Sequence, residues 1–554
     1  MADGISYQHP GVYIQELPGV PTIQGVSTSI PVFIGLTEKL ADEDAYVARQ
    51  VTSWGDYQTR YGANVWGAYA SFAVYEFFME GGALCYVIGL PPTDLPQTSK
   101  STAKVTVVDC TGSYTFSAAS AGSWANTLQI AILDAGPVPS AGKASNYFSI
   151  NVMVAASALA ATAATVWDKL LSVYVKNNSI KNVNGFYTLE SFGVFTASSL
   201  KTPSGGGLCP LQLQINSASM FIRVTGVKPT TGQQGARSVT PHQMSSGSTI
   251  PLSSLYAKAI PVLASVPDAS LVATPDAAVV ELTTQMTSIT QITDVITSVM
   301  AQCQKLPNLF YVIDAPYVSD PTNTTNIVTF VAGGTNTSPL IYENAAIYYP
   351  WPLVLNQSSG TNVPIPPSGP VLGRYATTDL VAGVHVSPAG VRTGRIATAM
   401  ALTGWLTDSD QDLLNPHGIN AIRNIPGYGI TIYGARTLAA GQWQYVAVRR
   451  FVTFVEQSLR ASLEWVVFEP NSELLWATVV REITAFLTLL WHQGALFGST
   501  ADDAFFVTCD VTNNPPSLRT QGVLNIDVGL AVLYPAEFVV IRVAQMTSTS
   551  SSGS

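Results

Sequence analysis

The chain has 554 residues, a formal charge of −9 and only 11% charged residues. Its length indicates more than one domain, since single cores stop growing near about 300 residues, and its acidic balance argues against nucleic acid as the main partner. Ordinary soluble domains carry about 25% charged residues, so either Ser, Thr, Asn and Gln cover this surface or other subunits cover it. We favour coverage by other subunits.

Residues 1–29 are predicted to form an extended N-terminal linking arm. Pro10, Pro18 and Pro21 prevent a helix, whereas the segment Val12-Tyr13-Ile14 has the composition of a strand. A strand without a partner close in sequence must pair elsewhere, either within the chain or with a neighbouring chain. We expect the second, and the linking residues are Val12, Tyr13, Ile14 and Gln15.

Residues 30–90 are predicted to form the first part of a mixed α/β body. Residues 31–35 and 84–88 have the composition of buried strands, and residues 66–79 have apolar residues at helical spacing. This βαβ order favours a parallel or mixed sheet.

Residues 91–265 are predicted to form an inserted, β-rich variable domain on the outside of the body. Short strands such as 104–108 and 221–224 alternate there with turns rich in Ser, Thr and Gly. Residues 152–167 are the most apolar stretch, but they are too short and too often interrupted for a membrane span. We expect a buried helix there and no direct membrane insertion.

Residues 266–535 are predicted to complete the α/β body. Strands are expected at 309–314, 345–349, 443–448, 505–508 and 523–532, and helices at 451–465 and 474–493. Asp314 ends a strand, where α/β enzymes place functional groups, but a capping or loop-fixing role is the expected one. His492 falls at a helix C-terminus, which favours a cation.

Residues 536–554 are predicted to be a C-terminal linking strand followed by a disordered Ser/Thr tail. Pairing of this strand within its own chain is the alternative. The predicted linking residues are Glu537, Phe538, Val539, Val540, Ile541, Arg542 and Val543.

The sequence contains no convincing catalytic, metal or cofactor site. The five cysteines are at least 25 residues apart, and the histidines are isolated. Residues 136–143 fail as a phosphate loop, because the spacing is wrong and Ala144 stands where Ser or Thr should bind the metal. Asp408, Asp410 and Asp412 lack the Gly and Glu of a calcium loop, so a solvated turn or the start of a helix is expected.

Ten segments, in this order along the chain, resemble the contractile tail sheath family. They are residues 10–16, 30–35, 81–87, 345–351, 366–369, 373–379, 445–450, 465–471, 494–498 and 535–540. The resemblance covers residues 1–90 and about 300–546, and its most specific part is the C-terminal quarter, with YVAVRR, WVVFEPN and GALFG. The resemblance does not extend to residues 91–265, as expected if that part varies within the family.

The resemblance implies a structural subunit of a phage tail or an injection system, assembled in the bacterial cytoplasm. Such subunits polymerise into a helical tube around an inner tube and contract to drive that tube through a target envelope. The implied partners are neighbouring sheath subunits, the inner tube, the baseplate and the tail terminator. The candidate inner-tube contacts are Arg449, Arg450, Arg460 and Arg481, and the alternative that we favour slightly is intrachain pairing with Glu456, Glu464 and Glu482.

Two other functions fit parts of the sequence. The Ser/Thr-rich β segments are typical of a secreted adhesin or surface-layer protein, but the first residues, MADGIS, do not predict a signal peptide. An α/β-hydrolase-like enzyme would need a nucleophile constellation, and the sequence contains none.

Overall fold

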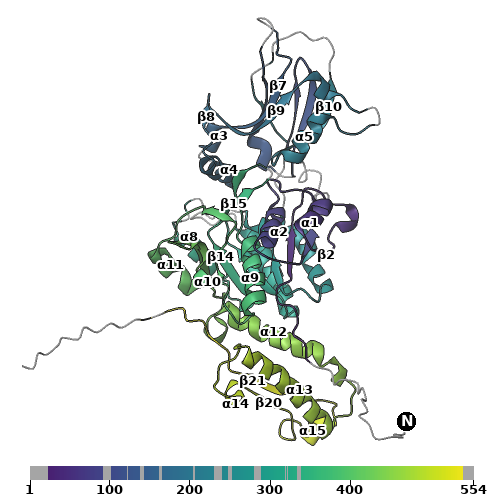
Figure 1. Cartoon of the computed structure of the whole chain (residues 1–554), viewed down its shortest axis with the longest axis vertical. Helices are drawn as coiled ribbons and strands as arrows, with labels where there is room; N and C mark the ends of the chain where they lie inside the picture. Colours follow the sequence, from purple (N-terminus) through teal and green to yellow (C-terminus); the bar gives the residue numbers. More distant parts are fainter. Residues whose placement is uncertain are drawn as a thin grey trace, which may run out of the picture. The chain divides into compact units, whose positions relative to one another are not determined.

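The chain forms two compact units, here called the body unit (residues 27–454 and 534–554) and the C-terminal unit (residues 1–26 and 455–533). A computed structural model describes residues 23–91, 102–120, 123–137, 143–160, 165–203, 206–229, 237, 240–246, 252–279, 289–318, 320, 322–333, 338–357, 359–538 and 540. The prediction of a mixed α/β fold is confirmed in both units (Figure 1).

An eight-stranded mixed sheet forms the centre of the body unit. Its strands are β1 (Pro31–Gly35), β2 (Arg49–Val51), β3 (Cys85–Gly89), β12 (Leu271–Ala273), β13 (Phe310–Asp314), β14 (Ala345–Tyr349), β18 (Ile419–Ile425) and β19 (Gly429–Ile432). They lie in the order β19-β18-β14-β13-β12-β1-β3-β2, and only the two outermost pairs are antiparallel. The parallel pairing of β1 with β3 confirms the predicted βαβ unit, and burial on both faces explains the continuous apolar runs.

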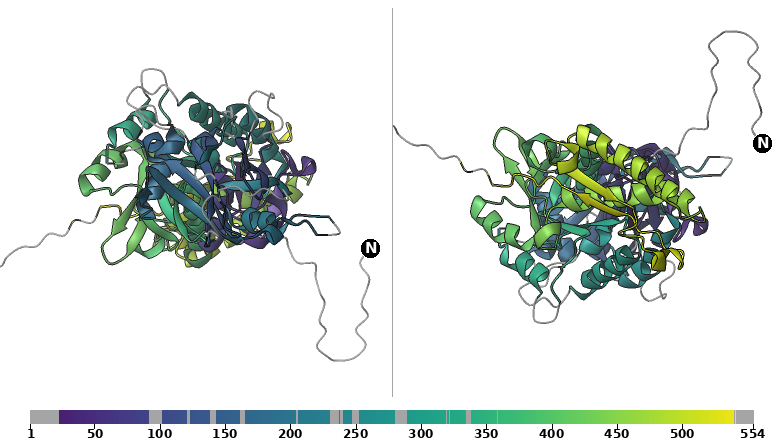
Figure 2. Two further views of the ribbon diagram at one scale, coloured as in Figure 1. Left: turned by 90° about the horizontal axis from the view of Figure 1, so that it is seen from above. Right: turned by 90° about the horizontal axis from the view of Figure 1, so that it is seen from below.

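Helices cover both faces of this sheet (Figure 2). Helices α2 (Tyr69–Met79) and α9 (Ser368–Ala382) pack on one face, and α6 (Leu252–Ala259) and α7 (Thr290–Lys305) pack on the other. Gly369 and Gly373, one turn apart on α9, bring the two helices close together. A Cβ on Gly369 would lie 2.5 Å from the Cα of Ala73, so a larger residue would push α9 away from α2.

Residues 102–246 contribute two further antiparallel sheets to the body unit, of three and five strands. Their elements are β4 (Lys104–Val108), β5 (Gly112–Ala118), β6 (Leu128–Asp134), β7 (Phe148–Ala155), α3 (Ala156–Leu159), α4 (Val166–Asn177), β8 (Asn182–Val183), β9 (Phe186–Phe195), α5 (Pro210–Ala218), β10 (Ile222–Pro229) and β11 (His242–Gln243). The hydrophobic core of this region is continuous with the core above the eight-stranded sheet, so a flexible linker does not separate the two.

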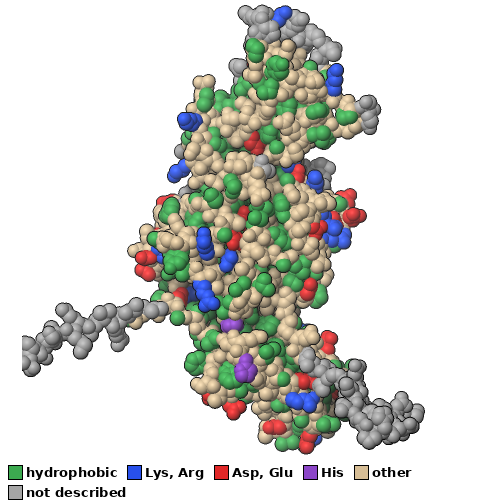
Figure 3. All heavy atoms as spheres, in the orientation of Figure 1, with side chains coloured by type: hydrophobic (Ala, Val, Ile, Leu, Met, Phe, Trp, Pro, Cys, Tyr) green, Lys and Arg blue, Asp and Glu red, His purple; other side chains and the backbone are tan. Residues whose placement is uncertain are grey.

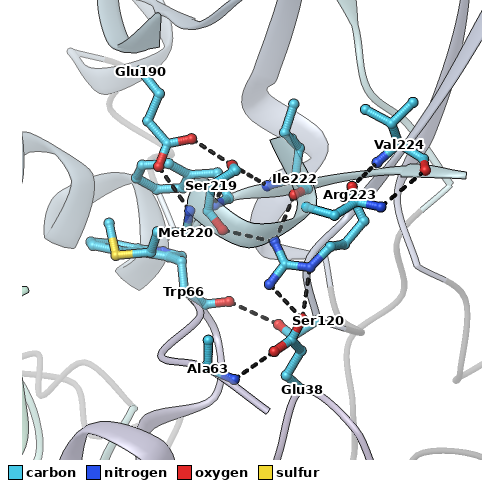
Figure 4. A network of polar contacts seen from close by, with 12 residues as sticks. Glu38, Ala63, Trp66, Ser120, Glu190, Ser219, Met220, Ile222, Arg223 and Val224 are labelled. Atoms are coloured by element: carbon cyan, nitrogen blue, oxygen red, sulfur yellow. Dashed lines mark hydrogen bonds and ion pairs between the residues drawn. The ribbon is translucent and has the colours of Figure 1, made fainter. Parts of the chain in front are cut away.

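A polar network joins the same two regions (Figure 4). The Arg223 Nε donates to Glu38 Oε1 at 2.8 Å, and Glu38 also accepts the backbone N–H of Ala63 at 2.6 Å. Deeper in the core, Glu190 accepts the N–H of Met220, and burial raises its pKa to about 7 despite this hydrogen bond. The contacts of Glu38 with Arg223 join the two regions and fix one orientation between them, whereas the Glu190 contact lies within residues 102–246.

The remaining elements of the body unit are short. They are α1 (Trp54–Tyr61), α8 (Thr325–Ala332), β15 (Pro352–Asn356), β16 (Thr361–Pro364), α10 (Gly390–Thr393), β17 (Ala399–Leu402) and α11 (Asp408–Leu414). Thr407 caps α11 in a capping box with Asp410, which confirms that the aspartate cluster begins a helix.

The C-terminal unit contains the end of α12 (Val446–Ser462), then α13 (Glu473–His492), α14 (Ala501–Ala504), β20 (Phe505–Thr508), α15 (Pro516–Arg519) and β21 (Asp527–Leu530). The predicted helix at 474–493 and strand at 505–508 are confirmed. Among the described helices, α13 alone has the length and apolar composition of a membrane span. One such helix is weak evidence, because core helices of soluble proteins have the same composition.

Two elements predicted before residue 536 are wrong. Residues 443–448 are not a strand, because α12 begins at Val446; its first turn is buried on every side and so lacks the apolar stripe that marks a helix. Residues 152–167 are not one helix, because β7 continues to Ala155 and only the short α3 follows directly.

Candidate functional site: the roots of the two terminal arms

The N-terminal arm begins from the body unit at a buried ion pair. Arg450, in the first turns of α12, donates to both carboxylate oxygens of Asp379 on α9, at 3.0 and 2.6 Å. The same guanidinium donates to the backbone oxygen of Thr28 at 2.8 Å, and the Thr28 hydroxyl donates to Asp379 at 2.6 Å. Bidentate arginine–carboxylate pairs are strong and directional, so this pair fixes the root of the arm.

In the C-terminal unit, α12 holds the preceding residues of the same arm. The N–H groups of Gln24 and Val26 donate to the hydroxyls of Ser462 and Ser458 at 3.2 and 3.1 Å. In an extended chain, the N–H groups of alternate residues point the same way and lie about 7 Å apart. Side chains four residues apart on a helix have a similar spacing. This match shows that residues 24–26 run extended beside the helix. The predicted linking residues Val12, Tyr13, Ile14 and Gln15 lie outside the described residues.

Two of the candidate inner-tube contacts, Arg449 and Arg450, lie inside the body unit. Both side chains are buried. The Arg449 Nε donates a hydrogen bond to Asn344 Oδ1 at 2.6 Å and forms an ion pair with Glu343 at 3.7 Å. The intrachain alternative holds for these two arginines, although the partners found are Asp379, Asn344 and Glu343. The start of α12 is inserted into the body unit, which explains the burial. Arg460 and Arg481 are exposed, and their contact with a tube stays a prediction.

The C-terminal tail leaves the body unit at a second anchor. Glu537 accepts hydrogen bonds from Arg436 Nε at 2.9 Å, from Asn415 Nδ2 at 2.7 Å and from the Tyr445 hydroxyl at 3.2 Å. Burial alone would raise the pKa of Glu537, but the hydrogen bonds from Arg436 and Asn415 outweigh it, so the pKa lies below its usual range. Glu537 is therefore an ionised intrachain anchor at neutral pH.

The predicted strand 537–543 is not formed at its described positions, which are Glu537, Phe538 and Val540. Phe538 and Val540 are 75% and 78% exposed, so the tail carries apolar side chains that this chain does not cover. Val539, Ile541, Arg542 and Val543 lie outside the described residues.

The C-terminal unit contains a sheet of only two strands, β20 and β21, paired from Phe505 with Leu530 to Thr508 with Asp527. Within the described part of the chain neither strand has a second strand as partner. Each therefore presents one edge to an added strand. Phe506 is exposed and its ring lies over Gly529, where a Cβ would clash at 2.0 Å.

The described residues contain no group of His, Cys, Asp or Glu suited to a metal. Asp314 accepts the N–H of Ser368 at the start of α9, which confirms its predicted capping role. The sequence predictions missed Thr28, Asp379, Arg436, Ser458 and Ser462. One signal was present, since Asp379 and Arg450 both end segments that carry the family resemblance.

Comparison with known proteins gives matches in the C-terminal region and over the whole fold. The family model of the phage tail sheath C-terminal domain matches residues 440–546. The tail sheath protein of Vibrio phage KVP40 is 31% identical over 156 residues, which are 28% of this chain and 22% of that protein. The tail sheath protein of Enterobacteria phage T4 is 26% identical over 156 residues, 28% of this chain and 23% of that protein. The aligned part thus spans less than a quarter of either relative.

Solved structures match over nearly the whole chain. The anti-feeding prophage helical sheath in its contracted state matches with a TM-score of 0.55 and 22% identity over 98% of this chain and 100% of that one. The sheath complex of the extracellular contractile injection system PVC, also contracted, gives a TM-score of 0.53 and 20% identity over 98% and 99% of the two chains. At these identities the matches show a shared fold.

Proposed function

We propose that this chain is a structural sheath subunit, on the premise that it belongs to the contractile tail sheath family. Such a subunit polymerises into a helical tube around an inner tube. The observation that carries the proposal is the position of the family match. Residues 440–546 contain the α12 side of the N-terminal arm root, the two-stranded sheet and the C-terminal anchor Glu537.

The two arms are proposed to link neighbouring subunits. Residues 12–15 and 537–543 add as strands to the open edges of β20 and β21 in other copies. Such pairing uses main-chain hydrogen bonds, so the links survive while subunits rotate. Because arm and sheet are different surfaces, the contact is heterologous, and it generates an open helical polymer when the rotation between copies does not close a ring. The anchors at Arg450 and Glu537 fix where each arm leaves the subunit.

Contraction is proposed to draw on the difference between two packings of the same subunits. A gain of a few kcal/mol per subunit, summed over many copies, moves the inner tube without nucleotide or cofactor. Arg460 and Arg481 are candidate contacts to that tube, and the baseplate and tail terminator bind the two ends. We place assembly in the bacterial cytoplasm, as part of a phage tail or a phage-tail-like particle.

Deleting residues 1–20 tests the linking role of the arm. The deletion ends before Gln24, so the anchors to Ser462, Ser458 and Arg450 remain. The expected product is a folded monomer with an unchanged thermal melt that forms no tubes by negative-stain electron microscopy. The full-length chain, prepared in parallel, is the control. Normal tubes from the deletion variant would refute the linking role.

The competing function is a secreted adhesin or surface-layer protein with β-rich outer segments. A surface-layer protein forms flat arrays or stays monomeric, whereas a sheath forms hollow tubes. The same micrographs therefore separate the two functions.

A further inference from the structure

Two arginines in the second half of the body unit differ from their neighbours in having no ion pair among the described residues. The region 306–454 contains seven arginines, and Arg392 and Arg395 are the unpaired two. The five ion pairs of the others are Arg374–Glu80, Arg423–Asp408, Arg436–Glu537, Arg449–Glu343 and Arg450–Asp379. Arg392 and Arg395 are exposed, and Lys and Arg side chains gather over α10 on the face shown in Figure 3.

The loop that carries these arginines is held rigidly. Arg374 donates twice to the backbone oxygen of Thr393, at 3.1 and 2.9 Å, and the Thr393 hydroxyl donates to Ser387 O and Ala389 O. The loop backbone also pairs with β19, because Ile396 N–H donates to Ile430 O at 2.9 Å and Ile432 N–H donates to Gly394 O at 2.8 Å. A fixed loop that brings like charges together loses little entropy on binding and favours an acidic partner.

An acidic surface of matching character lies on the same chain. Residues 455–533 contain nine Asp and Glu against three Arg, and eight of the nine acids are exposed. Two of them, Glu464 and Glu469, lie between α12 and α13, and a third, Glu473, is the first residue of α13; none of the three forms an ion pair among the described residues. Residues 464–473 are called the acidic turn below.

The acidic turn is also rigid and carries an exposed aromatic side chain. The Phe468 side chain is fully exposed, and its backbone φ of 72° is strained for a residue with a Cβ. Asn471 holds the turn by donating to Val523 O at 3.0 Å and by accepting from Trp476 Nε1 at 2.7 Å. Strain and full exposure of an aromatic side chain are typical of binding surfaces.

We propose that Arg392 and Arg395 of one copy bind the acidic turn of a second copy, with Val391 against Phe468. Val391 lies beside Arg392 in the loop and is 40% exposed, so each surface combines charge with an apolar side chain. The inference rests on the proposed function, because two different surfaces of one chain that fit each other make a heterologous contact, the kind from which a helical polymer is built. It adds a contact between folded units to the strand exchange of the arms.

Two charge-reversed variants test the contact, R392E/R395E and E464R/E469R. In the first variant both surfaces are acidic, and in the second both are basic. Copies of the same variant should therefore repel each other at this contact. An equimolar mixture again offers opposite charges at every contact. Sedimentation velocity at low ionic strength is expected to show self-association weakened at least about tenfold for each variant alone and restored in the mixture. K201E/K228E changes the net charge by the same amount as R392E/R395E, at exposed lysines outside both surfaces, and should associate like wild type.

The outcomes are distinct. Restoration in the mixture, lost at high salt, supports the contact. Variants that associate like wild type overturn it. Variants that fail alone and also fail when mixed, with unchanged thermal melts, show that Arg392 and Arg395 bind something other than the acidic turn, such as the inner tube, and overturn the assignment of the partner. If the wild-type chain stays monomeric, that result counts against the proposed function. In that case the contact is still refuted if the two variants do not bind each other at high concentration.

Discussion

Arg450 shows how one side chain can organise segments that are far apart in sequence. Its guanidinium binds Asp379, 71 positions away, and the backbone of Thr28, 422 positions away, and lies 4.6 Å from the centre of the Tyr375 ring. Both members of the ion pair are nearly inaccessible, with side chains 4% and 5% exposed. A buried charge is tolerated only when its partner is present, so each member depends on the other.

Replacing Arg450 with Ala is expected to lower the free energy of unfolding of the body unit by roughly 3–5 kcal/mol, because Asp379 is left as a buried unpaired carboxylate. Urea unfolding followed by tryptophan fluorescence measures the loss. Arg460→Ala, which removes an exposed arginine from the same helix, is the control and should change it by less than about 0.5 kcal/mol. Equal midpoints for the two variants would mean that the ion pair does not stabilise the arm root.

At the scale of elements, buried carboxylates connect the sheet to its helices. Asp276 follows β12, and its two oxygens accept the N–H groups of Tyr69, at the start of α2, and of Leu36 at 2.6 and 2.7 Å. Asp314 does the same for Ser368 at the start of α9. Both carboxylates lie at the carboxyl ends of parallel strands, where catalytic groups are often found. Here, however, they accept hydrogen bonds from N–H groups at helix N-termini.

Burial raises the pKa of Asp314 to about 7, although its hydrogen bonds with Ser368 oppose the shift. The native state then binds a proton between about pH 4 and pH 7 that the unfolded chain has released. The free energy of unfolding therefore falls as pH rises through this interval, by roughly 2–4 kcal/mol for a group of this kind, and is flat above it. Asp314→Asn keeps the hydrogen bond to Ser368 but cannot ionise.

Urea unfolding of the body unit at pH 5, 6, 7 and 8 tests this prediction. Asp314→Asn should show a flatter pH dependence than wild type and should gain relative stability at pH 8. Asp294→Asn, at an exposed position on α7, should follow the wild-type curve. Parallel curves for wild type and Asp314→Asn would show that this carboxylate ionises at its ordinary pKa in the fold.

Across the whole molecule, the sequence predicts helices and strands that follow a local pattern, but it does not predict contacts between residues that lie far apart in the chain. β1 and β13 were predictable because strands buried on both faces have continuous apolar runs, and α13 because its apolar stripe is regular. The pattern at the start of α12 indicates a strand instead, because a helical turn that is buried on all sides has no apolar stripe. Arg450 and Glu537 have partners 71 and 101 positions away, so the sequence did not distinguish intrachain anchors from intersubunit contacts.

The arms themselves remain predictions at this scale, since residues 12–15 and most of 537–543 lie outside the described part of the chain. The two anchors, the open edges of β20 and β21 and the exposed Phe538 are the features of the single subunit that a linking role would use. They are consistent with a chain that has few charges because neighbouring copies cover much of its surface.

Negative-stain electron microscopy of the purified full-length chain, alone and with its inner tube protein, tests the central claim most directly. We expect hollow, striated tubes, formed by the chain alone or with the inner tube as template. Compact, monodisperse particles under both conditions would contradict a sheath subunit.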